Sequence, residues 1–454
     1  MTRKYEMNMC EGPLLSKLVL FAVPLMLSSI LQLLYNAADV IVVGKFAGST
    51  ALAAVSSTGS LINLIVNLFI GLSVGANVAA ARFFGAKDER GVHETVHTAM
   101  LLSIIGGIAV GIIGFFCSGT FLKWMDSPPD VIGQATLYMQ IYFCGMPASM
   151  VYNFGASILR AIGDTRRPLI FLTISGIVNV ILNLVLVIVF HMGVAGVAIA
   201  TVVSQVLSAI FVVVCLIRAE GSAFQLFPRK LRIYRDKLQI MLRTGIPAGI
   251  QGSVFSISNV LIQSSINSFG SIAMAGNGAA GNIEGFIYVA MNAFHHAALT
   301  FASQNLGAHN LARIRRVAVT CVLIVTVVGL ALGGAALLCG EMLLSIYDSD
   351  PAVISYGMVR MRIICLTYFA CGIMDVMGGL MRGLGYSIAP MLVSMLGACG
   401  LRVLWIFTFF RWEPTLVCLY TSYPISWVLT ASAHAVCFFI ALRIVKKKLS
   451  AGTL

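Results

Sequence analysis

Acidic side chains inside long apolar segments are the residues of this chain that are best placed to do chemistry. Of the 17 Asp and Glu residues, only Asp39, Glu284 and Asp375 lie well inside apolar runs. An ionised carboxylate at the centre of a bilayer costs about 2.5 to 3.5 kcal/mol on insertion scales, so such a residue is a functional candidate by default. We therefore expect these groups to bind a cation or to take up a proton.

Asp39 ends a polar stripe on the first apolar segment. Gln32, Tyr35, Asn36 and Asp39 follow the i, i+3, i+4, i+7 spacing of one helix face. A polar face cannot lie against lipid, so we expect it to face a bundle interior or a hydrated cavity. Hydrogen bonds that merely hold two helices together are the alternative. The rarity of intramembrane acids favours a functional role for Asp39.

Two later segments add oxygen-bearing side chains. Asn179 and Asn183 lie four residues apart on one helix face, and Thr201 follows in the next segment. Amide and hydroxyl oxygens suit a dehydrated hard cation. Intramembrane Asn is also a common link between helices, so both interpretations of this pair stay open.

Glu284 begins a polar face in the second half of the chain, followed by Tyr288, Asn292 and His295 at helical spacing. Histidine titrates near neutral pH, but a single intramembrane His is more often a satisfied structural residue. Glu284 is a candidate for cation or substrate binding on the same argument as Asp39.

Asp375 stands in the second half of the chain at the place that Asn153 has in the first, since each precedes an arginine by seven residues. The two halves thus differ in charge at an equivalent place. This difference is expected if one half binds a cation in a different way from the other half. Residues Asn153 and Asp375 are both candidates. A salt bridge from Asp375 is the structural alternative, and its possible partners are Arg360, Arg362 and Arg402.

Composition places these residues in an integral membrane protein. Hydrophobic residues make up 59% of the 454 residues and charged residues 10%, whereas soluble chains average about 25% charged residues. No Walker A loop, His-Glu-x-x-His, zinc spacing or Gly-x-Ser-x-Gly occurs, so we expect no enzymatic reaction, no cofactor and no tightly bound metal. Nucleic acid is a poor partner, because the basic residues lie between the apolar runs.

Twelve segments are long enough to span the hydrocarbon, which takes about 20 residues per helix. We predict spans at 14–43, 52–82, 95–121, 132–159, 168–190, 193–217, 239–266, 273–306, 317–340, 354–381, 388–410 and 414–442. Most of the 30 Lys and Arg residues then fall on one side of the membrane. The positive-inside rule makes that side, with both termini, cytoplasmic.

An internal repeat divides the chain. The shift in numbering that places Gly85-Ala86 on Gly307-Ala308 also places Pro168 on Pro390, and a shift longer by one position places Pro24 on Pro247. We therefore predict two six-helix bundles, related by an axis along the membrane normal. Their bounds are 1–217 for the N-terminal lobe, 218–238 for a basic cytoplasmic linker and 239–454 for the C-terminal lobe. Pro24 and Pro247 should kink the first helix of each lobe and serve gating.

Several motifs, taken together, resemble the multidrug and toxic compound extrusion (MATE) transporters over essentially the whole chain. They run from Pro24 through Tyr35 to Asp39 and Gly44, and include Gly85-Ala86, Leu159-Arg160-Ala161-Ile162-Gly163-Asp164-Thr165 leading to Pro168, Gly193 to Thr201, and Gln304-Asn305-Leu306-Gly307-Ala308. The resemblance implies a V-shaped, all-helical fold of two six-helix lobes in the cell membrane. It also implies export of amphipathic, often cationic, drugs in exchange for H+ or Na+.

The resemblance also implies site residues. Members with an N-terminal ion site use a first-helix Asp, matched by Asp39, and an Asn and a Thr that match Asn179 and Thr201. Asn183 stands where an Asp is usual, which removes one negative charge and leaves the coupling ion, Na+ or H+, open. Members with a C-terminal site resemble this chain at Asp375.

The predicted function is therefore a secondary active antiporter that acts as a monomer in the lipid bilayer on small-molecule drugs. The alternative is a flippase of related fold for lipid-linked precursors, in which Arg360, Arg362 and Arg402 would line a cavity for diphosphate headgroups. A membrane receptor without transport is a third class, and the repeat and the polar-lined helices argue against it.

Overall fold

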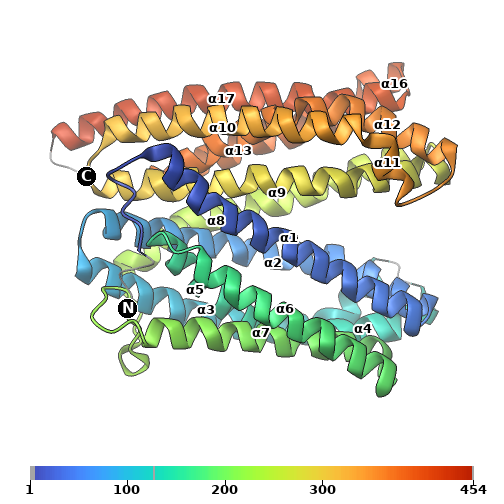
Figure 1. Ribbon diagram of the computed structural model, residues 1–454, viewed down its shortest axis with the longest axis horizontal. Coiled ribbons are helices and arrows are strands. Elements are labelled where there is room, and N and C mark those ends of the chain that lie inside the picture. The colour runs from blue at the N-terminus through green and yellow to red at the C-terminus, as the bar shows by residue number, and fades with distance from the viewer. Residues whose placement is uncertain (1–5, 126–127, 452–454) are drawn as a thin grey trace. The chain divides into compact units, whose positions relative to one another are not determined.

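The structure, a computed structural model, describes residues 6–125 and 128–451, and all regular structure within them is helical (Figure 1). The helices are α1 (Leu14–Phe46), α2 (Ser49–Gly85), α3 (Glu89–Trp124), α4 (Pro129–Cys144), α5 (Met146–Ala161), α6 (Arg166–Leu184), α7 (Gly193–Ile217), α8 (Arg235–Asn267), α9 (Ser271–Gly307), α10 (Leu311–Leu338), α11 (Gly340–Ser345), α12 (Pro351–Ile364), α13 (Tyr368–Gly383), α14 (Ile388–Ser394), α15 (Leu401–Phe407), α16 (Phe409–Trp412) and α17 (Leu416–Ser450). Short π-helical turns, η2 (Val185–Val189) and η5 (Met395–Gly400), and 3-10 turns, η3 (Pro228–Lys230) and η4 (Cys365–Thr367), complete the set.

Each of the twelve predicted spans corresponds to a helix or to consecutive helices. Among the described residues, ten helical stretches are long and apolar enough to cross a membrane. The other two predicted spans are not among these ten stretches, one because of its length and the other because of its composition. Residues 132–159 are divided at Gly145 between α4 and α5, each of 16 residues. Residues 273–306 lie within the 37-residue helix α9, whose Ser, Asn and Gly content keeps it polar. The prediction of an all-helical membrane protein is confirmed.

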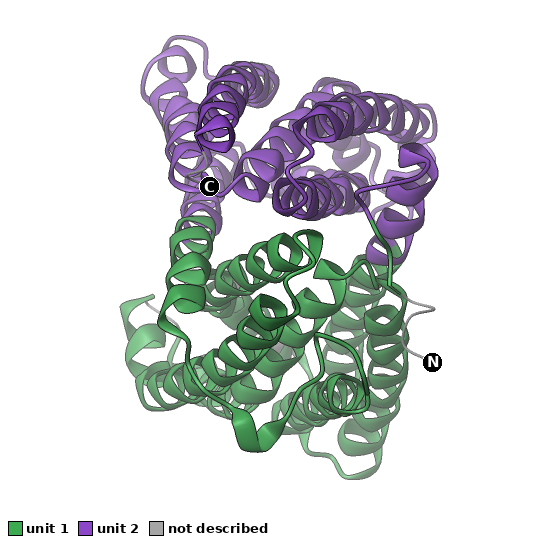
Figure 2. Cartoon of the chain, turned by 90° about the vertical axis from the view of Figure 1, so that its left-hand side faces the viewer, with its two compact units in different colours: residues 1–8, 27–249 green, residues 9–26, 250–454 purple. Residues whose placement is uncertain are grey.

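The chain forms two compact units (Figure 2). Unit 1 contains residues 1–8 and 27–249, and unit 2 contains residues 9–26 and 250–454. The chain therefore passes from one unit to the other inside α1 and again inside α8. In both helices the passage lies two residues after a proline, Pro24 or Pro247. The predicted lobe bounds, 1–217 and 239–454, remain a prediction.

The internal repeat extends to details of helix ends. Asp88 accepts a hydrogen bond from a backbone N–H at the start of α3, and Asn310, the corresponding residue of the second repeat, does the same for α10. Side-chain caps of this kind satisfy N–H groups that have no partner within the helix. Gly163 and Gly385, which correspond in the same way, have φ of 93° and 86° after α5 and α13. Only glycine adopts such angles without strain, so backbone geometry requires glycine in both turns.

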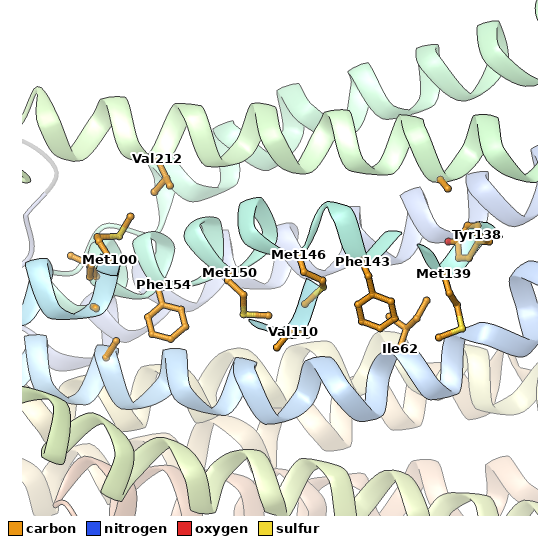
Figure 3. Packing of buried hydrophobic residues seen from close by; sticks show 14 of the residues in the cluster. Ile62, Met100, Val110, Tyr138, Met139, Phe143, Met146, Met150, Phe154 and Val212 are labelled. Atoms are coloured by element: carbon orange, nitrogen blue, oxygen red, sulfur yellow. The ribbon is translucent and has the colours of Figure 1, made fainter. Parts of the chain in front are cut away.

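The core of unit 1 is a continuous apolar cluster between α2, α3, α4, α5 and α7. Methionines and aromatic rings fill it, among them the buried Met146, Met150, Phe143 and Phe154 (Figure 3). Unbranched Met side chains adapt to irregular gaps between helices. In unit 2, α13 packs against α9, α10 and α17 in the corresponding way.

Glycines let α2 and α8 approach each other closely within unit 1. A Cβ atom added at Gly71 would come within 2.2 Å of the Gly249 backbone nitrogen, and one added at Gly75 within 2.2 Å of the Met241 backbone oxygen. The glycines thus let the two helix backbones touch. The connection before α8 is held to α3: the backbone N–H of Phe227 donates to Nε2 of His97 at 3.1 Å.

Gly71→Ala should destabilise the protein, because its Cβ would overlap backbone atoms that cannot rotate away. Overpacking of this kind costs about 1 to 3 kcal/mol, and we expect a lower melting temperature of the purified protein in detergent. Gly59→Ala is the matched control, since nothing lies within 4 Å of its added Cβ in the same helix. Alanine favours a helix over glycine by up to about 1 kcal/mol. Equal melting temperatures for the two variants would contradict close α2–α8 packing.

Candidate ion and substrate site

Asp39 is half-buried on α1 and meets the two predicted asparagines of α6. The Asn183 side-chain amide donates a hydrogen bond to Oδ1 of Asp39 and a second one, at 3.3 Å, to Oδ1 of Asn179. Asn179 and Asn183 are 4% and 0% exposed, so the amides are fixed in the interior of unit 1 while the carboxylate stays partly accessible. The structure therefore brings Asn183 against Asp39, and Asn179 against Asn183.

A glycine brings α1 and α6 together at this place. The Tyr35 ring lies against Gly176, where an added Cβ would come within 1.8 Å of the ring. The Tyr35 hydroxyl donates to the backbone oxygen of Thr173 at 3.3 Å. Tyr35 and Asp39, one helical turn apart, thus both face α6. Gly176 is a positioning residue that the sequence analysis missed, since nothing in its neighbours distinguishes it from other helical glycines.

The oxygens at Asp39 fit a small cation. Asn183 Oδ1 is buried and has no hydrogen-bond partner among the described residues. Such an orphaned acceptor is costly in a low-dielectric interior, and a cation or a proton donor beside it would remove that cost. Within the described ranges no group of three or more His, Cys, Asp and Glu side chains gathers as a metal site would.

Other predicted members of the site lie elsewhere. Gln32 and Asn36 are exposed rather than packed against α6. Thr201 donates its hydroxyl to Val197 O at 3.0 Å, one turn back in α7. Asn153 donates its amide to Ser149 O at 2.9 Å within α5. These bonds satisfy the side chains within their own helices, so they add no donor to the Asp39 carboxylate in this conformation.

Glu284, on α9 in unit 2, forms a buried ion pair with Arg360 of α12. Both carboxylate oxygens accept hydrogen bonds from the guanidinium at 2.7 Å, from Nε and Nη2. Nη1 of Arg360 donates to Oδ1 of Asn277, which also accepts from the Tyr420 hydroxyl. Arg360 thus pairs with Glu284 and not with Asp375. Asn277 and Glu284, seven residues apart on α9, form a helical face that could have suggested this cluster from sequence.

Asp375, on α13, has a different environment. Its Oδ2 atom is buried and has no hydrogen-bond partner in the described part of the chain. Its backbone oxygen accepts from Nδ1 of His295 at 2.6 Å, which makes Nδ1 the protonated nitrogen, and Nε2 then faces Arg382 Nη1 at 3.5 Å. Arg382 itself donates to Gln251 Oε1 at 2.6 Å. Unit 2 therefore holds a second intramembrane carboxylate without a salt bridge to any described residue, so Asp375 stays a candidate.

The conspicuous Gln304–Ala308 segment ends α9 and holds the chain that precedes α1. Gln304 Oε1 accepts from the Met9 backbone N–H at 3.1 Å, and the Asn305 amide donates to Met9 O at 3.2 Å. Arg313 adds a hydrogen bond to the same oxygen at 2.8 Å. The motif therefore binds the backbone of the chain that precedes α1.

Comparison with known proteins gives a consistent result over the whole chain. A family model described as MatE matches residues 24–185 and 247–408, so the two matched regions have equal lengths and begin at Pro24 and Pro247. Together they exceed half of the chain. The boundaries agree with the repeat derived from single residues.

Individual relatives are similar over nearly their full length. The chain is 27% identical over 402 residues to the "Probable multidrug resistance protein YpnP" of Bacillus subtilis, covering 88% of this chain and 90% of that protein. It is 24% identical over 392 residues to the "Probable multidrug resistance protein NorM" of Thermotoga maritima, covering 84% and 82%. A solved structure titled "Outward-facing conformation of a multidrug resistance MATE family transporter of the MOP superfamily" matches with a TM-score of 0.92 at 21% identity, covering 98% and 100%. That likeness shows the fold.

Glu284→Gln should destabilise the protein strongly, because it leaves the Arg360 guanidinium buried without a counter-charge. Removing one partner of a buried pair costs about 3 to 5 kcal/mol. The measurement is the melting temperature in detergent. The double variant Glu284→Gln with Arg360→Met should recover most of the loss, since no unpaired charge remains.

Arg90→Gln is the control for loss of an ion pair as such, because Arg90 is 88% exposed in its pair with Glu94. Exposed pairs contribute about 0 to 1 kcal/mol. A Glu284→Gln variant as stable as Arg90→Gln would refute the structural role of the pair.

Proposed function

Because the chain belongs to the MatE family, we propose that it is a secondary active antiporter that exports amphipathic and cationic drugs in exchange for H+ or Na+. The names of the relatives from Bacillus subtilis and Thermotoga maritima support the drug substrates. The protein resides in the cell membrane as a monomer with both termini in the cytoplasm. The distribution of Lys and Arg supports that orientation.

One observation carries the proposal: Asp39 is an acid in a membrane helix that is partnered by an amide and not by a cation. Its carboxylate accepts from Asn183, and no Lys, Arg or His nitrogen among the described residues lies within 4.0 Å of it. A permanently paired acid, such as Glu284, cannot exchange its partner. An acid with a neutral partner can take up and release a small cation in every cycle.

Ion binding at Asp39 would act on α1 and α6. Asn183 donates to an ionised Asp39, so a proton or Na+ on the carboxylate competes with that hydrogen bond. The bond holds the part of α1 after Pro24 to α6. An ion can drive transport only by binding one conformation more tightly than the other, and making or losing this bond supplies such a difference. One charge crossing 100 mV contributes about 2.3 kcal/mol, enough to sustain a drug gradient.

The choice of ion depends on the number of carboxylates at the site. Asp39 is accompanied by two amides, so a bound Na+ would be neutralised by one negative charge only. Sites for hard cations gain affinity with each added carboxylate. The single acid therefore favours protonation as the coupling step, with Na+ as the other outcome of the test below. No enzymatic step and no cofactor enters this proposal.

The arrangement of Arg360, Arg362 and Arg402 supports the flippase alternative less well than it supports drug export. They do not form a common diphosphate site, since the Nε, Nη1 and Nη2 atoms of Arg360 all donate to Glu284 or Asn277. Arg362 is exposed on α12. Of the three, Arg402 keeps a buried donor that has no partner among the described residues. One free guanidinium donor group is a poor match for a diphosphate.

Asp39→Asn should abolish ethidium efflux from cells while the protein still reaches the membrane, because the amide can neither be protonated nor bind a cation by charge. We expect a loss of at least about tenfold in the initial rate, the order expected of a proton-transfer group. Asp130→Asn, an exposed acid at the start of α4, is the control and should retain wild-type efflux. Wild-type resistance in the Asp39→Asn strain would exclude coupling at this acid. If Asp375→Asn abolishes efflux and Asp39→Asn does not, the coupling ion binds in unit 2.

Asn183→Asp should shift coupling toward sodium, since it restores a second carboxylate beside Asp39. The measurement is drug efflux from proteoliposomes under an imposed Na+ gradient and, separately, a proton gradient. Wild-type protein should respond to the proton gradient, and the variant should respond to Na+ at concentrations at least about tenfold lower than wild type does. An unchanged Na+ response in the variant would show that the ion does not bind between α1 and α6.

A further inference from the structure

Arg402 is a buried cation that no described acid neutralises. It lies on α15 in unit 2 and is 3% exposed. Its Nε donates to Ser426 Oγ at 2.9 Å, and its Nη2 has no hydrogen-bond partner among the described residues. Aromatic rings of α17 flank the guanidinium, with the Tyr423 ring centroid at 4.2 Å and the Trp427 centroid at 5.6 Å.

The neighbouring charged groups do not supply a counter-ion for Arg402. Tyr423 lies between two guanidiniums, because Arg360 is 5.7 Å from the same ring. Arg360 is matched by Glu284 in a bidentate pair, whereas no carboxylate in the described part of the chain lies within 4.0 Å of Arg402. Cation–π contacts contribute about 2 kcal/mol or more when desolvated, which is small beside the cost of burying an unpaired charge.

The internal repeat places Arg402 at the position of an ion-site residue. The matched family regions end at residues 185 and 408. The difference between these two numbers is larger by one than the difference between Pro168 and Pro390. One extra residue therefore enters the second repeat after Pro390. The π-helical turn Met395–Gly400 accommodates such an insertion, since a π turn contains one more residue than an α turn. Beyond that turn Arg402 corresponds to Asn179, which accepts a hydrogen bond from Asn183, the partner of Asp39 in the first repeat.

We propose that Arg402 is the receptor for a single anionic group, a carboxylate above all, on an amphipathic substrate. The inference rests on the proposed export function and assigns one specificity-determining residue of the substrate site. The first repeat offers a carboxylate to a cation, and the second repeat offers a guanidinium to an anion.

The geometry at Arg402 suits such a group. A guanidinium N–H donates charge-assisted hydrogen bonds to a carboxylate, and such bonds are about twice as strong as neutral ones. Nη2 is a donor without an acceptor among the described residues. Tyr423, whose ring centroid lies 4.2 Å from the guanidinium, is half-buried, and an aromatic substrate body could stack on such a ring. A diphosphate would need more free donors than Arg402 has.

The test compares two probes that differ only in charge: a rhodamine dye with a free carboxylate and the methyl ester of the same dye. Binding of each to the purified protein is measured by fluorescence anisotropy. Arg402→Gln should raise the Kd of the carboxylate dye at least about tenfold, the size expected for loss of a charged hydrogen bond. The Kd of the ester should change less than about twofold, because the ester has no negative charge to lose.

Matched variants separate recognition from folding. Arg411→Gln removes the same charge at an exposed position of α16 and should leave both Kd values unchanged. Arg402→Lys, which keeps the charge, should retain part of the carboxylate preference. Benzoate should displace the carboxylate dye better than benzamide and better than inorganic pyrophosphate.

Three results would overturn the proposal: equal loss of both dyes in Arg402→Gln, an unchanged Kd for the carboxylate dye, or stronger displacement by pyrophosphate than by benzoate. The first would make Arg402 a structural link between α15 and α17. The third would indicate a phosphate-bearing ligand. Failure of wild-type proteoliposomes to export the ester dye would instead refute the export function, and it would leave the binding difference standing.

Discussion

The cost of a charge in a low-dielectric interior is the constraint on which this structure depends. The helices cross an apolar phase, so each ionisable side chain inside them needs a partner or must be lost. The chain meets this constraint in three ways. Glu284 has a permanent guanidinium partner in Arg360. Asp39 has a neutral amide partner in Asn183. Arg402 has the Tyr423 ring and the Ser426 hydroxyl as neutral partners. Only the first arrangement is complete within the described protein, so the other two are where exchangeable ligands are expected.

The same fold serves both repeats while the chemistry differs. Helix caps and left-handed glycines recur at corresponding positions of the two repeats, because they determine the backbone. Interior side chains at corresponding positions of the two repeats can differ in charge. The acid of α1 has an apolar residue, Ile262, at the corresponding position of α8. Backbone geometry therefore restricts where a polar group can stand, and the side chain at that place determines which ion or substrate it receives.

The sequence predicts the fold well and the site in part. Apolar length and loop charge predicted the helices because lipid forces every backbone hydrogen bond inside a helix. The spacing of Asn179 and Asn183 predicted their shared face, and the rarity of intramembrane acids selected Asp39. The partner of Glu284 could not be predicted, since Arg360 lies on another helix and no helical periodicity relates α9 to α12. Thr201 and Asn153 fit the expected pattern in sequence, yet their side chains are satisfied within their own helices.

The position of Asp39 explains why an ion there can control a helix as long as α1. Within α1, residues 14–26 belong to unit 2 and residues 27–46 to unit 1, so the change occurs two residues after Pro24. Pro24 has no N–H to close the helical turn, so α1 is least resistant to bending near that residue. Asp39 lies about four turns further on, at about 3.6 residues per turn, and its bond to Asn183 holds that distant part of α1 to α6. Under the proposed function, a ligand that changes this one bond would change how firmly the part of α1 beyond Pro24 is held to α6. Conversely, any bend of α1 at Pro24 must change the geometry of the Asp39 carboxylate, which is the reciprocity that coupled transport requires.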